Sequence, residues 1–154
     1  MLNKLKKSDN KGFTIIEVMI VLAIAGLIIL IVLLAVPALQ RNGRNTAMKN
    51  DASAVTGGIS EFTSNNDGIG PMTVTSGVGG VVTLASTVAG TAPTTARVQG
   101  GTTVNTAGTL TPPIGTISVK LAARCDGTAN ARAYAVRYSI ENSSATPQYK
   151  CIDG

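Results

Sequence analysis

The fold of this chain follows from residues 12–36, which read GFTIIEVMIVLAIAGLIILIVLLAV. From Val18 to Val36 this stretch contains no charged side chain. A helix needs about twenty predominantly apolar residues, at roughly 1.5 Å of rise each, to cross the hydrocarbon core of a bilayer. We therefore expect a membrane-spanning helix close to the N-terminus.

The residues before this stretch, MLNKLKKSDNKG at positions 1–12, are polar and carry four lysines against one aspartate. Basic residues beside a membrane helix favour the cytoplasmic side, so we expect the leader to stay there and the rest of the chain to be exported. Arg41 and Arg44 oppose this orientation, but the first basic cluster is denser. The expected precursor is a single-pass protein of the inner or cytoplasmic membrane.

Two ordinary explanations compete for such an N-terminus. A cleaved secretory signal has an apolar region of about 7–15 residues and a small-x-small cleavage site; here the region is longer, and AVPA at 35–38 is a poor version of that site. An uncleaved anchor leaves Glu17 unexplained, because an acidic side chain in a hydrophobic segment costs about 2.5–3.5 kcal/mol on insertion scales. Either Glu17 lies at the headgroup level, or it has a function and a partner.

A short basic leader ending in Gly12, then FTIIE at 13–17 and a long apolar helix, resembles the class III signal of type IV pilins and the related pseudopilins. The resemblance covers roughly residues 1–40. It implies that prepilin peptidase cuts after Gly12 and methylates the new amino group of Phe13. It also implies that Glu17 pairs with the Phe13 amine of a neighbouring subunit during assembly.

The same resemblance implies a fold, a set of partners and a location. The fold is α+β, the type IV pilin fold: the apolar half of a long N-terminal helix lies in the membrane or filament core, and the second half packs on a small antiparallel sheet. The partners are further copies of the chain in a helical filament, the membrane before assembly, and the prepilin peptidase with the pilus assembly machinery. The final location is an extracellular pilus.

Charge and composition narrow the function. The net charge is +5 with a pI near 9.5, but removing the leader leaves only +2, which is no argument for a nucleic-acid binder. The chain has no His and two cysteines, so it lacks most familiar zinc spacings and every Cys/His or Ser/His catalytic pair. We expect no catalytic residues, no metal site and no cofactor, and a structural protein rather than an enzyme.

Beyond the apolar stretch, hydrophobic side chains recur at alternating spacings of four and three, which places them on one face of a continuing helix. They are Met48, Ala52, Val55, Ile59 and Phe62. Lys49, Asp51, Ser53, Ser60, Glu61 and Ser64 are expected mostly on the other faces, which we expect to be exposed to water.

The helix should end at NNDG, positions 65–68, where Gly68 suits a C-terminal cap. From Phe13 to Asn65 it would measure about 80 Å at 1.5 Å per residue. Pro37 removes a backbone donor and should kink or loosen the preceding turn. Pilins that resemble this chain often lose helix locally near such positions once they are packed in the filament.

The stretch from Ile69 to Pro113 is rich in Thr, Gly, Ser, Ala and Val and has a weak pattern. We expect a loop with local β structure, with short strands near 81–88 and 96–98. Pilins place a variable connection at this point of the chain.

The last third of the chain contains two alternating segments, at 117–121 and 134–140, which predict two half-buried strands. The connection between them contains Asp126-Gly127, so an antiparallel hairpin is the economical interpretation. Cys125 shares parity with the inward residues of the first strand and should point inward. A third short strand, 148–152, would bring Cys151 back toward Cys125.

Two cysteines in an exported domain suggest one disulfide, between Cys125 and Cys151. In a chain-entropy estimate such a closure contributes about 3–4 kcal/mol. The alternative is a pair of free, buried thiols.

The main hypothesis is a structural pilin subunit whose filament serves motility, adhesion or DNA uptake. The alternatives are a minor pilin, a type II secretion pseudopilin, which commonly carries a calcium site where this chain has its cysteines, or a DNA-binding or adhesive tip pilin. That last hypothesis uses basic residues on the sheet, but stacking aromatic side chains are missing beside them. The residues are Lys120, Arg124, Arg132 and Arg137.

Together these expectations divide the chain into five parts. They are a leader (1–12), a transmembrane and polymerisation helix (13–37), an amphipathic continuation (38–66), a variable region (67–115), and an antiparallel sheet closed by the disulfide (116–154).

Overall fold

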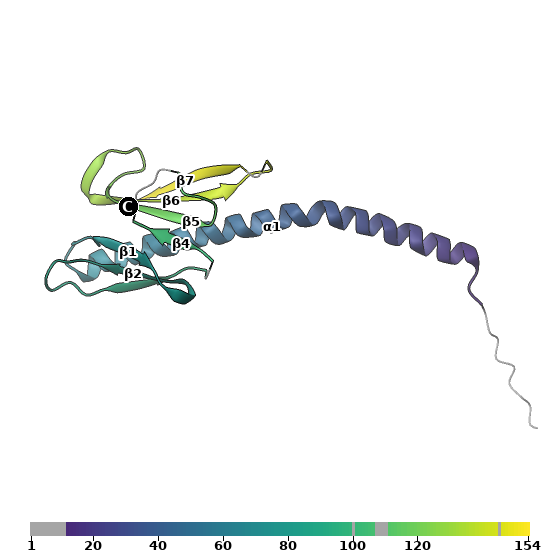
Figure 1. Cartoon of the computed structure of the whole chain (residues 1–154), viewed down its shortest axis with the longest axis horizontal. Coiled ribbons are helices and arrows are strands. Elements are labelled where there is room, and N and C mark those ends of the chain that lie inside the picture. The colour runs from purple at the N-terminus through teal and green to yellow at the C-terminus, as the bar shows by residue number, and fades with distance from the viewer. Residues whose placement is uncertain (1–11, 100, 107–110, 145) are drawn as a thin grey trace, which may run out of the picture. The chain divides into compact units, whose positions relative to one another are not determined.

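The structure is a computed structural model, and it describes residues 12–154 apart from positions 100, 107–110 and 145. The chain divides into two units, with the boundary between Ala38 and Leu39. One helix, α1 (Ile15–Asn65), begins in the first unit and ends in the second (Figure 1). The expected leader falls on positions 1–11, outside the described residues, and on Gly12.

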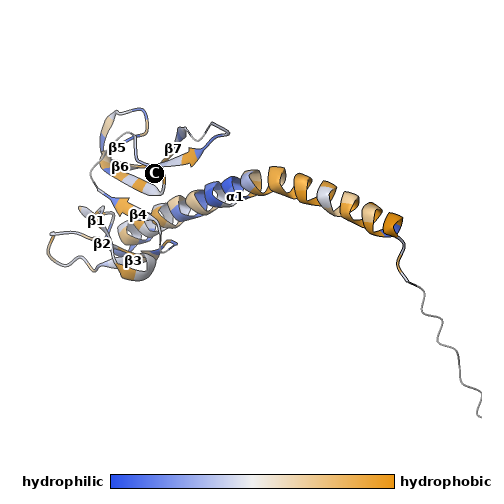
Figure 2. Cartoon of the chain, turned by 45° about the vertical axis from the view of Figure 1, so that its right-hand side comes forward, coloured by the Kyte–Doolittle hydropathy of each residue, from blue (hydrophilic) through white to orange (hydrophobic). Residues whose placement is uncertain are grey.

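The first unit contains the apolar part of α1, which is orange in Figure 2. Its large hydrophobic side chains from Val18 to Val36 are between 38% and 75% exposed. Within the described chain, α1 is the helix long and apolar enough to cross a membrane, and none of its apolar window is buried. This part of the helix therefore forms no hydrophobic core with the residues that the structure describes.

The second unit begins with the amphipathic part of α1, whose buried face is the one that the spacing predicts. The buried residues are Met48, Asp51, Ala52, Val55, Gly58, Ile59 and Phe62. The helix continues through Pro37 without a break in its secondary structure.

The end of α1 lies where the sequence predicts it. After Asn65, Asp67 and Gly68 adopt positive φ values of 54° and 81°. The Gly68 N–H donates to the Thr63 carbonyl over 2.8 Å, which satisfies one of the last carbonyls of the helix.

Seven strands form one sheet in the order β3-β2-β1-β4-β5-β6-β7. All neighbours are antiparallel except β4 and β5, which are parallel. The structure is therefore α+β with a mostly antiparallel sheet, consistent with the type IV pilin fold. The elements after α1 are β1 (Thr73–Ser76), the 3-10 helix η1 (Val78–Gly80), β2 (Val81–Ala85), β3 (Thr94–Arg97), β4 (Thr103–Asn105), β5 (Thr116–Ala123), β6 (Ala129–Glu141) and β7 (Pro147–Asp153).

The described part of the region from Ile69 to Pro113 contains more strands than the sequence predicts. Instead of a loop with two short strands, it supplies β1 to β4. The expected strand at 81–88 ends at Ala85, and the one at 96–98 lies at 94–97. β1 and β4 each bury a single side chain, Val74 and Val104, so neither produces a visible alternation.

The hairpin in the last third is confirmed. β5 and β6 pair antiparallel with Ile117 opposite Tyr138, and β7 pairs with β6 on the far side. One detail differs from the prediction: Ala122 has a φ of 55°, and the register shifts between Leu121 and Ala123. A bulge of this kind reverses the alternation beyond it.

The core of the second unit lies between α1 and the sheet. Phe62 and Ile59 are its largest fully buried side chains, and valines from the strands surround them. Both halves of the sheet contribute, so the variable region is part of the same core as the C-terminal strands. The strand residues of the cluster are Val74, Val82, Leu84, Ala96, Val104, Ile117, Val119, Val136 and Tyr138, with Val98 just beyond β3.

Candidate processing and assembly site

Thr14 and Glu17 form a capping box at the start of α1. The Thr14 backbone N–H and hydroxyl donate to Oε2 of Glu17 over 3.0 and 2.9 Å, and the Glu17 N–H donates to Thr14 Oγ1 over 3.3 Å. These bonds satisfy donors that a helix N-terminus otherwise leaves without partners.

This local role of Glu17 is one that the sequence analysis missed. The signal was present, because Thr-x-x-Glu immediately before an apolar run is a typical capping box. The two bonds that the Glu17 carboxylate accepts both use Oε2, and Oε1 accepts no hydrogen bond within the described residues. The carboxylate can therefore cap its own helix and still accept a bond from another chain.

Gly12 and Phe13 precede the helix in a segment without regular secondary structure. The Phe13 side chain is 88% exposed. The peptide bond between the two residues therefore lies outside the hydrogen-bonded helix.

The apolar surface beside Glu17 is shallowly hollowed. Phe13, Glu17, Val18, Val21 and Leu22 line a cavity of about 280 Å³. Continuous apolar surface of this kind is unusual on a soluble monomer and indicates contact with lipid or with protein.

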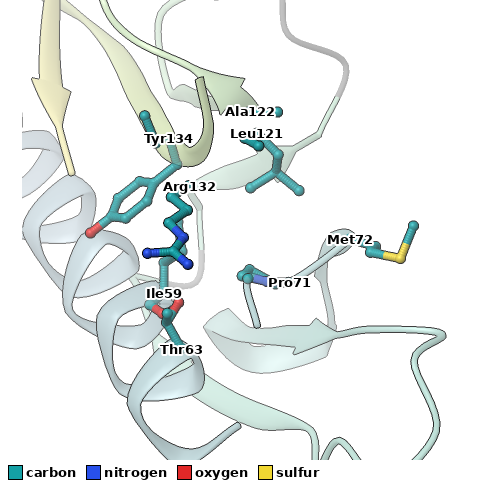
Figure 3. A pocket seen from close by; sticks show the side chains of 11 residues that line it. Ile59, Thr63, Pro71, Met72, Leu121, Ala122, Arg132 and Tyr134 are labelled. Carbon is teal, nitrogen blue, oxygen red and sulfur yellow. The ribbon is translucent and has the colours of Figure 1, made fainter. Parts of the chain in front are cut away.

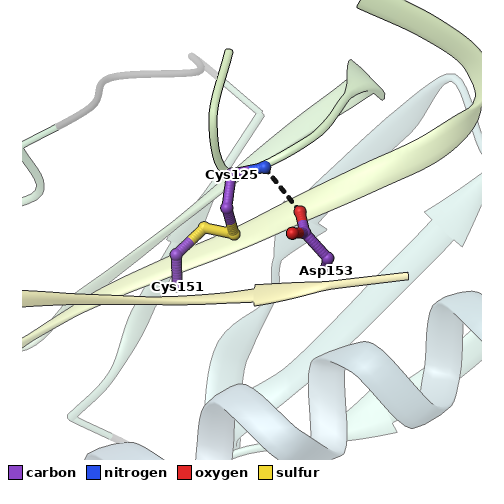
Figure 4. Close-up of side chains that lie close together, drawn as sticks. All are labelled: Cys125, Cys151 and Asp153. Carbon is purple, nitrogen blue, oxygen red and sulfur yellow. Dashed lines mark hydrogen bonds between the residues drawn. A yellow bond between two sulfur atoms is a disulfide. The ribbon is translucent and has the colours of Figure 1, made fainter. Parts of the chain in front are cut away.

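The cysteines form a disulfide between Cys125 and Cys151, with a Cα–Cα distance of 5.9 Å (Figure 4). It joins the β5–β6 connection to β7 across 26 residues of sequence. The Cys125 N–H also donates to Oδ1 of Asp153 over 2.5 Å, and the Arg137 guanidinium donates to the Cys125 carbonyl. These contacts hold the end of β7 against the hairpin connection.

The inward orientation that we expected for Cys125 is wrong. The residue lies beyond the bulge at Ala122, in the connection, and is only partly buried, while Cys151 is exposed. Cys125, Cys151 and Asp153 are close enough for their ligand atoms to surround a metal ion, but the two sulfur atoms are bonded to each other. A disulfide offers no thiolate ligand.

The basic residues singled out for nucleic-acid contact lie on different surfaces. Lys120 and Arg137 share one face of the sheet by strand alternation, and Arg124 is exposed in the hairpin connection. Arg132 lies on the side facing α1, where it lines a cleft of about 330 Å³ with Thr63 (Figure 3). The structure does not bring the four cations together into one patch.

Asp51 is a second residue that the sequence analysis placed wrongly. Expected on an exposed face, it is 5% exposed and accepts bonds from the Gln99 N–H over 3.0 Å and from the Thr102 hydroxyl over 2.5 Å. It therefore ties α1 to the segment between β3 and β4. Asp51 is next to Ala52, at the border of the buried face, and this position could have indicated that its side chain is buried.

An ion pair links α1 to the end of β6. Arg44 donates from Nε and Nη2 to the two carboxylate oxygens of Glu141, over 2.9 and 2.6 Å. These bonds hold the pKa of Glu141 below its ordinary value and raise the pKa of Arg44. Asn45 completes the contact, because its side chain donates to the Glu141 carbonyl and accepts from the Glu141 N–H, each over 2.8 Å.

Comparison with known proteins identifies the N-terminal segment. Residues 7–33 match the family model described as the prokaryotic N-terminal methylation motif. Neither the curated proteins nor the solved structures gave a match. The motif and the long apolar helix are consistent with a type IV pilin-like prepilin, which is a structural class of protein. Both features also fit a membrane-anchored precursor.

Proposed function

We propose that this chain is a filament subunit, stored in the membrane and then polymerised into an extracellular type IV pilus. Prepilin peptidase cleaves it after Gly12 and methylates the amino group of Phe13. The observation that carries the proposal is the exposed apolar segment of α1, which bears Glu17 inside a methylation motif. We also keep the five-part division of the chain as part of this proposal.

The surface of the exposed segment suits both storage of the subunit in the membrane and its polymerisation. Its side chains are apolar on all sides, as a helix surrounded by lipid requires. The same side chains can pack against identical helices after the subunit leaves the bilayer, because close packing and excluded water stabilise either state.

Glu17 supports a defined register between subunits. In a filament core its carboxylate and the Phe13 ammonium of a neighbour would each lose hydration, and joining them removes two uncompensated charges. A subunit out of register would leave Glu17 unpaired in apolar surroundings. Oε1, which the capping box leaves available, is the atom that would accept this bond.

The first experiment is intact mass and N-terminal sequencing of protein recovered from sheared cell-surface material. We expect a chain that begins at N-methylated Phe13. A chain that begins at Met1, or one cut after Ala38, would instead indicate an anchored or secreted domain and would overturn the proposal.

A second experiment separates the two roles of Glu17. Glu17→Gln keeps the capping pattern, because Gln also closes a capping box, but removes the charge. Thr14→Ala removes the cap and keeps the charge. We expect Glu17→Gln to abolish or strongly reduce filaments and Thr14→Ala to assemble. The reverse result would show that Glu17 serves only its own helix.

The finer choice within the class follows from the C-terminal region. Type II secretion pseudopilins commonly carry a calcium site where this chain has a disulfide, so we favour a pilin over a pseudopilin. The separation of the four basic residues gives no support to a nucleic-acid-binding tip subunit.

A further inference from the structure

Charge is segregated along the part of α1 that belongs to the second unit. Arg41, Arg44 and Lys49 come first, and the exposed charges that follow, Glu61 and Asp67 at the C-terminal end, are acidic. Among the described residues the one ion pair is Arg44–Glu141. Lys49, Glu61 and Asp67 therefore have no charged partner in that part of the chain.

The acidic end is unfavourable for the helix itself. The C-terminus of a helix carries partial negative charge, so cations stabilise it and carboxylates destabilise it. The last turn of α1 contains no basic residue, while Glu61 lies just before it and Asp67 just after it. Arg132 lines the cleft beside Thr63 near this end, but it forms no ion pair with Glu61 or Asp67. The two carboxylates can therefore still pair with cations of another molecule.

A positively charged groove lies at the other end of the unit, between α1 and the edge strand β7. It has a volume of about 380 Å³, and Lys49 from the helix and Lys150 from β7 line it. Tyr138 is 7% exposed and also lines it, and its hydroxyl makes no hydrogen bond to the described residues. No carboxylate lines this groove, and the nearby Glu141 is already bound by Arg44.

We propose that the groove binds the acidic end of a second copy of this chain, so that Lys49 and Lys150 of one subunit face Glu61 and Asp67 of the next. This inference rests on the proposed filament function and adds a contact between the globular units. The contact joins two different surfaces, so it is head-to-tail, and it builds an open filament when the rotation between neighbours does not close a ring. From the helix positions of Lys49 and Glu61, contacting copies would be offset along α1 by about 18 Å at 1.5 Å per residue.

A second copy explains more than another anion would. Both halves of the contact are present on this chain, and each lacks a partner within its own described residues. A free polyanion would neutralise the lysines but would leave the acidic end of α1 in its unfavourable state. Complementary charges on the two faces also exclude a head-to-head arrangement, since like charges would then meet.

The test is a charge swap in the full-length chain, scored as the amount of sheared filament per cell. Lys49→Glu with Lys150→Glu should reduce filaments by at least about tenfold, and Glu61→Lys with Asp67→Lys should do the same, because like charges then face each other. All four substitutions together should restore assembly. The matched control is Arg97→Glu with Arg124→Glu, two exposed cations outside the groove, and should assemble normally.

Each other outcome overturns the inference. If the groove variant assembles normally while Glu17→Gln does not, the proposed function stands and this contact does not exist. If the groove variant loses filaments while the acidic variant keeps them, the groove binds a different anion. Failure of the four-fold variant to restore assembly, with its thermal unfolding midpoint unchanged, would equally exclude the pairing.

Discussion

Residues 18–36 and residues 48–62 belong to the same helix, yet they differ in every packing property. The first segment is apolar on all sides and exposed throughout, whereas the second is apolar on one face, which is buried against the sheet. Fully burying such a side chain contributes about 1.5–3 kcal/mol. The second segment gains this stabilisation by packing within the chain. The first segment can gain it only by packing against lipid or against other subunits. Apolar residues without a periodic face therefore indicate an intermolecular surface here.

The largest expected effect comes from one substitution made in both segments. Ile59→Ala, at a side chain 1% exposed, should lower the free energy of unfolding of the second unit by about 2–5 kcal/mol. Ile28→Ala, at 55% exposure, should change it by less than about 0.5 kcal/mol. Denaturation of the detergent-solubilised chain, followed by near-ultraviolet circular dichroism, measures this, because all three tyrosines lie in the second unit. Equal effects would contradict the comparison.

Loss of the disulfide should be the next largest effect, and it also acts on the second unit alone. Cys125→Ser with Cys151→Ser should lower the free energy of unfolding by about 3–4 kcal/mol, because the unfolded chain regains the entropy of an open loop. The same measurement on the unmodified chain with reductant is the control. If neither the double substitution nor the reductant moves the unfolding midpoint, the sheet holds β7 in place without the disulfide.

Two adjacent glycines in the second segment test how closely the helix packs against the sheet. A Cβ at Gly58 would lie 2.8 Å from Ala96 Cβ, whereas a Cβ at Gly57 meets nothing within 4 Å. Gly58→Ala should therefore destabilise by about 1–3 kcal/mol through overpacking. Gly57→Ala should stabilise by about 0.5–1 kcal/mol, since alanine loses less backbone freedom on folding. A stabilising Gly58→Ala would mean that helix and sheet are not in close contact there.

The smallest expected effect concerns the Arg44–Glu141 pair between α1 and β6. The pKa of Glu141 is lowered from 4.5 by its bonds to Arg44, so the pair's contribution is complete above that pH. It is lost as the pH falls through the lower pKa of the folded state. The Glu141→Gln variant has no ion pair to lose at low pH. The difference in unfolding midpoint between the unmodified chain and this variant should therefore shrink below pH 4.5. A difference that is constant with pH would exclude the pair as its source.

The sequence predicted those parts of the site and fold that depend on neighbouring residues. Both segments of α1, its end near Gly68 and the β5–β6 hairpin follow from spacing and turn chemistry. The capping box was equally local and could have been found. Asp51 was placed wrongly because its partners, Gln99 and Thr102, are about fifty residues away. Nothing in a local pattern shows that a polar side chain will find them.

The apolar stretch, Glu17 at its start and the periodic face from Met48 to Phe62 can all be read from the order of the residues, because periodicity and hydrophobicity are properties of neighbours in the chain. The joining of strands as short as β1 and β4 to the sheet, and the bulge at Ala122 that turns Cys125 out of alignment, depend instead on contacts made in the folded state. The pairing of Arg44 with Glu141, 97 positions apart, also belongs to the second group. Such contacts exist only after the chain has closed long loops, so their energies are absent from any local pattern.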